Sequence, residues 1–161
     1  MRHQTKQKLY FMNISKALKE KNKIAKQYKN ILFQMSAYNS TVASSPVYFD
    51  VKKLASTAEE LRNKLIQLKT DIHYSTQPVR KEIFKLSELK SYLNILQNLN
   101  TTEGETSDYR GTVTKYVVQI TEIEKLNMIK EVEERIEQLQ DVLDSFNAST
   151  PLTSLAVELP F

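Results

Sequence analysis

Residues 121–146 read TEIEKLNMIKEVEERIEQLQDVLDSF and form the most regular stretch of the chain. Apolar residues recur there every three or four positions, a spacing that places them on one face of an α-helix. These residues are Ile123, Leu126, Ile129, Val132, Ile136, Leu139, Leu143 and Phe146. Thr121 and Glu124 have the spacing of a capping box, in which each side chain binds the other residue's backbone N–H. The stretch therefore predicts a long amphipathic helix that needs an apolar partner.

Three further stretches show the same spacing of apolar residues: 14–38, 50–72 and 78–96. Ser15 and Asp50 are the expected N-caps of the first two helices, because their side-chain oxygens can accept a backbone N–H. Four amphipathic helices of this length can bury their apolar faces only against one another. We therefore predict an all-α protein, an antiparallel four-helix bundle with long helices.

The length and the composition favour one globular domain. The chain has 161 residues, of which 40% are hydrophobic and 26% charged, with two glycines, four prolines and no cysteine. This balance is typical of soluble globular proteins and leaves few residues for tight turns. We predict a flexible basic lead at 1–11, a helical bundle domain at 12–148 and an apolar C-terminal tail at 149–161.

The helical spacing is interrupted between the third and fourth helices. Residues 101–112 contain both glycines and no aliphatic side chain, so we predict a loop there. Tyr116, Val118 and Ile120 then alternate with other residues, which predicts a short β-strand at one end of the bundle. The preferred partner for this strand is 47–49 in the connection between the first two helices. The C-terminal tail and the same strand of a second copy remain alternatives.

Positive charge is concentrated in the first 29 residues, which hold nine basic residues and one acidic residue. The first helix carries Lys16, Lys19, Lys23, Lys26 and Lys29. Clustered lysines of this kind can bind a nucleic-acid backbone. The favoured interpretation is that they pair inside the bundle with acids of the fourth helix such as Glu137, Asp141 and Asp144.

The residues for common kinds of catalysis are missing from the sequence. There is no glycine-rich phosphate loop, no cysteine for a thiolate site, and neither histidine has the spacing of a bundle metal site. We predict no catalytic, cofactor or metal site and no enzyme activity. Since no apolar run approaches the ~18 residues of a membrane span, we expect a cytoplasmic protein that does not act at membranes.

The remaining apolar residues favour association with a protein partner or with a second copy, as a dimer. The candidate contact residues at the bundle end are Tyr116, Val118, Ile120, Val47 and Phe49. The C-terminal tail adds Leu155, Val157, Leu159 and Phe161, which have no obvious place in a helix and either fold back over the bundle or contact a partner. Binding of nucleic acid through the five lysines of the first helix is the alternative function. No small-molecule substrate is indicated.

The order of segments resembles the septicolysin-like family of small bacterial helical proteins. The residues that carry the resemblance lie at 12–18, at 49–54 followed by Leu61, Leu65, Leu68 and Ile72, at 116–124, and at 136–141 leading to 147–152. The chain has Phe146-Asn147 near the place of the family's Asn-Trp pair, and Ser87-Glu88 in place of its Arg-Asp pair. The resemblance implies a helical fold. It implies no activity or catalytic residue, and the sequence contains no membrane-inserting segment of the kind that the word cytolysin suggests.

Overall fold

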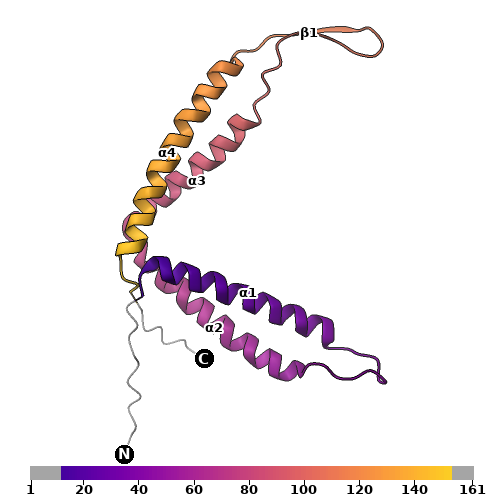
Figure 1. The fold of residues 1–161 in the computed structure, drawn as a ribbon, viewed down its shortest axis with the longest axis vertical. Helices are drawn as coiled ribbons and strands as arrows, with labels where there is room; N and C mark the ends of the chain where they lie inside the picture. Colours follow the sequence, from indigo (N-terminus) through magenta and orange to yellow (C-terminus); the bar gives the residue numbers. More distant parts are fainter. Residues whose placement is uncertain (1–11, 154–161) are drawn as a thin grey trace, which may run out of the picture. The chain divides into compact units, whose positions relative to one another are not determined.

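The computed structural model describes residues 12–153, which fold mostly as α-helix (Figure 1). Four α-helices and one small sheet are present in that range, which confirms the predicted helical class. In chain order the elements are α1 (Ile14–Tyr38), α2 (Val51–Ser75), the 3-10 turn η1 (Gln77–Val79), α3 (Arg80–Gln97), β1 (Gly104–Ser107), β2 (Val113–Tyr116) and α4 (Glu122–Ser149). The chain divides into two compact units, Met1–Pro78 with Ser145–Phe161, and Val79–Asp144.

In the first unit, α1 and α2 lie side by side as a helical hairpin (Figure 1). The core of this hairpin is built from residues of the predicted apolar faces: Ile14, Ala17, Ile24, Ala58 and Leu65. Asp50 caps α2 as expected, with its carboxylate accepting the N–H of Lys53 at 3.1 Å. The rings of Tyr38 and Phe49, with centroids 4.6 Å apart, pack together next to the connecting loop.

The N-cap of α1 is Asn13, and the prediction of Ser15 is wrong. The side-chain oxygen of Asn13 accepts the N–H of Lys16 at 2.9 Å. Its backbone is extended, with φ −79° and ψ 166°, as a capping residue requires, whereas Ser15 already lies inside the helix. Ser and Asn have similar capping strength, so local preference alone does not separate the two positions.

The same asparagine joins the start of α1 to the end of α4. Its side-chain N–H donates to the carbonyl of Ala148 at 2.8 Å, and the backbone N–H of Ile14 donates to the carbonyl of Thr150 at 3.1 Å. The N–H of Leu152 donates to the carbonyl of Met12 at 2.7 Å. Ile14, directly after the cap, is fully buried. We call this set of contacts the junction.

The end of α2 also contributes to the junction. Ser75 is buried, and its hydroxyl oxygen accepts the backbone N–H of Thr153 at 2.9 Å. Thr76 is the C-cap of α2. Its hydroxyl donates to the backbone carbonyl of Ile72 at 2.8 Å and so provides a partner for an acceptor at the end of this helix. The chain from 150 to 153 is thereby fixed to both helices of the first unit.

The second unit contains α3, most of α4 and the sheet, which follows α3 in the chain. Its buried apolar residues are Val79, Leu96, Val132 and Leu143. Ile123 and Leu126 were expected in the core but are 73% and 54% exposed. The reason is that α3 ends at Gln97, and Lys125 already contacts the carbonyl of Leu99, beyond that end. The first turns of α4 thus extend past the apolar face of α3.

The sheet differs from the one predicted. β2 spans Val113–Tyr116 instead of 116–120, and its partner is β1, inside the segment predicted as a loop, instead of 47–49. The two strands are antiparallel, with Gly104 opposite Tyr116 and Ser107 opposite Val113. The alternation of Tyr116, Val118 and Ile120 was therefore misleading, since the last two follow the strand.

The turn between the strands explains this pairing. The carboxylate of Asp108 accepts the backbone N–H groups of Arg110 and Thr112, each at 2.9 Å. Gly111 has a φ of 80°, a conformation that glycine adopts without steric cost. Such a turn fixes the register of a hairpin and compensates for the low strand preference of the sequence GETS in β1.

We expect Asn13→Ala to lower the free energy of unfolding by about 1 to 2 kcal/mol, because it removes a helix cap and a link between two helices. Urea denaturation followed by circular dichroism measures this loss. Ser15→Ala is the matched control and should change stability by less than about 0.5 kcal/mol. Equal losses in the two variants would contradict the assignment of the cap.

Candidate functional site

The second unit has a groove lined by residues of α3 and α4. Its volume is about 860 Å³. The lining residues are Lys81, Phe84, Lys85, Glu88, Leu89 and Tyr92 from α3, and Arg135, Gln138, Leu139 and Val142 from α4. Ligand and peptide sites are commonly concave and mostly apolar, so this groove is the candidate functional site.

Exposed apolar side chains form much of the groove surface. Phe84, Tyr92 and Val142 are 61%, 42% and 52% exposed, while Leu89 and Leu139 are half-buried between them. Only Leu89 and Leu139 belong to the regular apolar faces identified in the sequence. The other three lie beside those faces, so the groove exposes apolar side chains that the regular faces of the two helices do not include.

The charged residues of the groove are mostly basic. Lys81, Lys85 and Arg135 face one acid, Glu88, among the lining residues. Lys81 and Lys85 are one helical turn apart on α3, where like charges repel. An apolar ligand that also carries negative charge would relieve this repulsion and would fit the surface best.

The five lysines predicted as a nucleic-acid contact all lie exposed on α1. At about 100° per residue, Lys16, Lys19, Lys23 and Lys26 share the side of α1 opposite its buried residues, with Lys29 at the edge. Lys23 lies 3.9 Å from the carboxylate of Glu20 in the same helix, an exposed contact that contributes little. The expected pairing with acids of α4 remains a prediction, since Glu137, Asp141 and Asp144 belong to the other unit.

The predicted partner-contact residues are distributed over both units. Tyr116 is exposed, and Val118 and Ile120 are half-buried; these three line a smaller hollow of about 290 Å³ beside Leu99. In the first unit Val47 is exposed, and Phe49 is half-buried against Tyr38. Leu155, Val157, Leu159 and Phe161 lie outside the residues that the structure describes.

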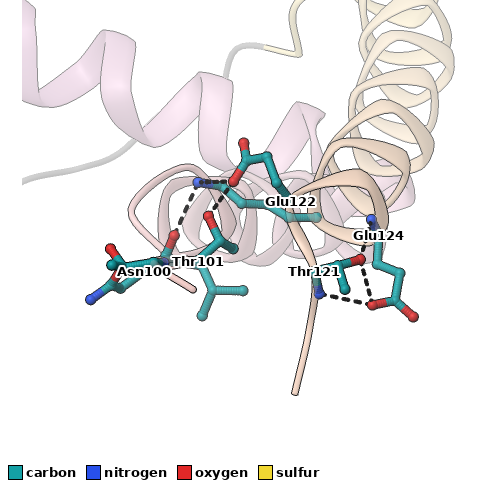
Figure 2. Close-up of polar contacts among 8 residues, drawn as sticks. Asn100, Thr101, Thr121, Glu122 and Glu124 are labelled. Atoms are coloured by element: carbon teal, nitrogen blue, oxygen red, sulfur yellow. Dashed lines mark hydrogen bonds and ion pairs between the residues drawn. The ribbon is translucent and has the colours of Figure 1, made fainter. Parts of the chain in front are cut away.

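A polar cluster joins the chain that leaves α3 to the start of α4 (Figure 2). The ammonium group of Lys125 donates to the carbonyl of Leu99 at 3.0 Å and lies 3.8 Å from the carboxylate of Glu122. That carboxylate also accepts the hydroxyl of Thr101. The side chain of Lys125 is only 13% exposed, so these contacts are shielded and fix the exit of α3 relative to the start of α4.

The predicted capping box at the start of α4 is confirmed (Figure 2). The carboxylate of Glu124 accepts both the backbone N–H and the hydroxyl of Thr121, each at 2.8 Å. The hydroxyl oxygen of Thr121 in turn accepts the N–H of Glu124 at 3.3 Å. The bond from the backbone N–H, with a smaller effect of the hydroxyl, lowers the pKa of Glu124 below its ordinary value of 4.5.

In residues 12–153, histidine, aspartate and glutamate side chains do not gather in a group of three or more that could hold a metal ion. None of the helices in this range combines the length and the apolar character that crossing a bilayer requires.

Three residues of the groove, Phe84, Tyr92 and Val142, were not predicted as site residues. A second apolar strip beside the regular one was the signal that could have identified them.

The lowered pKa of Glu124 gives a pH dependence with a defined sign. Because the folded-state pKa lies below the unfolded one, the capping box stabilises the fold above about pH 4.5, and this contribution is lost as the pH falls through the lowered pKa. Titration of the side-chain carboxyl carbons by NMR should show Glu124 titrating below 4.5. Thr121→Ala should recover only the smaller part of the shift, since the backbone N–H remains. A Glu124 pKa at or above 4.5 would contradict the capping box.

Comparisons with known protein families, with curated protein sequences and with solved structures find no match for this chain. The similarity to the septicolysin-like family, which rests on the residues quoted above, therefore remains a prediction.

Proposed function

We propose that this chain is a non-enzymatic helical protein of the cytoplasm that acts by associating with copies of itself. The groove between α3 and α4 is the observation that supports this proposal. Phe84, Tyr92 and Val142 keep about half of their surface in water there. Exposed apolar surface of this kind, bordered by charged residues, is typical of protein contact sites.

The predicted antiparallel four-helix bundle belongs to the same proposal. It is supported by two observations: α1 packs along α2, and α3 and α4 line one groove. In such a bundle α1 and α2 would form one half, and α3 and α4 the other. The groove uses only Leu89 and Leu139 from the regular apolar faces, so the remaining apolar residues of α3 and α4 are available for bundle packing while the groove binds a partner.

Nucleic-acid binding is the second candidate function. It is favoured by the exposure of Lys16, Lys19, Lys23 and Lys26 on one side of α1. Such a row could contact successive phosphates of a backbone. The row contains no arginine and no interleaved aromatic side chain. It therefore lacks the bidentate and stacking contacts that give nucleic-acid interfaces much of their strength.

Light scattering coupled to gel filtration tests self-association. We expect a mass of twice the 18.7 kDa of one chain, with dissociation on dilution. Phe84→Ser should weaken the association, because it removes an exposed aromatic ring from the groove. Phe33→Ser is the matched control, since Phe33 is also exposed but lies on α1. A single-chain mass at every concentration up to about 0.5 mM, a range that detects even weak dimers, would refute self-association.

Replacing Lys19, Lys23 and Lys26 together by Glu tests the alternative. If α1 binds nucleic acid, the unchanged chain binds a short fluorescent DNA or RNA with a steep dependence on salt, and the triple variant does not. If the lysines only pair within the bundle, neither protein binds, and the variant unfolds at a lower urea concentration. We expect the second result. Fluorescence anisotropy and urea denaturation distinguish the two.

A further inference from the structure

We propose that the C-terminal segment 154–161 of one copy binds in the α3–α4 groove of a second copy. This inference rests on the self-association proposed above and names the segment that makes the contact. It joins two features that are otherwise unexplained: a groove with exposed apolar residues, and an apolar segment with no place in the predicted helices.

The segment has the sequence pattern of an extended ligand. Leu155, Val157, Leu159 and Phe161 occupy every second position. Side chains of an extended chain point alternately to opposite sides, so these four would form one continuous apolar face. Ala156 and Glu158 would lie on the other face. A helix would scatter the same four residues around its surface.

The lengths of the segment and the groove agree. Six steps from Leu155 to Phe161, at about 3.3 Å each, span about 20 Å. The lining residues of α3 extend from Lys81 to Tyr92, eleven steps of about 1.5 Å that cover about 16 Å. The apolar face of an extended segment can thus contact the groove over its whole length, including both exposed aromatic rings.

The charges are complementary as well. Between 151 and 161 the only charged side chain is Glu158. It falls on the face opposite the apolar residues. The residues that line the groove include Lys81, Lys85 and Arg135 against one acid, Glu88. An acid brought close to these basic residues would reduce their like-charge repulsion.

The junction supplies a fixed starting point for the segment. The N–H groups of Leu152 and Thr153 bind the carbonyl of Met12 and the hydroxyl of Ser75, so the chain is anchored up to the residue at which the segment begins. Two copies that each offer a segment and a groove can exchange segments reciprocally. This gives two identical contacts related by a two-fold axis, the commonest symmetry of protein dimers.

The test uses the full chain with substitutions in the segment. A double variant, Val157→Asp with Leu159→Asp, places two charges on the apolar face and should weaken dimerisation at least about tenfold. Ala156→Asp adds a charge to the opposite face and is the matched control; its dimer should persist. Analytical ultracentrifugation over a dilution series measures both dissociation constants.

A mixing experiment shows which copy provides the segment. The double segment variant retains its groove, and Phe84→Ser retains its segment. An equimolar mixture should form more dimer than either variant alone, because one complete contact forms between unlike copies. If the segment bound the groove of its own chain, the mixture would show no gain, and this result would overturn the inference.

The two proposals fail in different ways. A wild-type chain that remains a single copy refutes self-association and this inference with it. A wild-type dimer that the double segment variant leaves unchanged refutes only the inference and leaves self-association through another surface. A dimer weakened equally by the double variant and by Ala156→Asp contradicts the proposed extended apolar face.

Discussion

The side chain of Asn13 makes the contacts on which the first unit depends. One amide group caps α1 through its oxygen and holds the end of α4 through its nitrogen, at 2.9 and 2.8 Å. The start of a helix leaves backbone N–H groups without partners, and the end of a helix leaves backbone carbonyls without partners. Asn13 satisfies one group of each type: it accepts the N–H of Lys16 and donates to the carbonyl of Ala148. The fully buried Ile14 follows directly. The polar contacts of Asn13 therefore lie directly beside the first buried apolar residue of α1.

A second constraint is the limited area that two helices can bury on each other. α3 and α4 carry apolar residues beyond their regular faces, and helices that contact each other along one face leave such residues uncovered. The excess is concentrated at Phe84, Tyr92 and Val142. The bond from Lys125 to Leu99 and the hairpin turn at Asp108 connect the segments that follow α3 to one another and to the start of α4.

Helix positions were predictable because they depend on local periodicity and capping. Asp50 and the Thr121–Glu124 box were identified correctly, since each acts within three residues of its own position. The N-cap at Asn13 was missed because its advantage comes from a contact 135 residues away. The strand pairing was missed because the turn at Asp108, and not the strand residues, fixes it. The groove depends on which residues two distant helices leave uncovered, and one helix pattern does not contain that information.

The hydrogen bond between Leu152 and Met12 has a consequence for the topology of the chain. It places the two ends of the described region in contact, so the path from 12 to 152 is nearly a closed ring. In such a ring the order of the helices along the polypeptide is partly arbitrary. A circular permutant that joins these ends through a short linker, with new termini in the exposed turn at 108–112, would keep every helix and each junction contact. In such a permutant the helices would follow one another in a different order along the chain, with the same contacts at the junction.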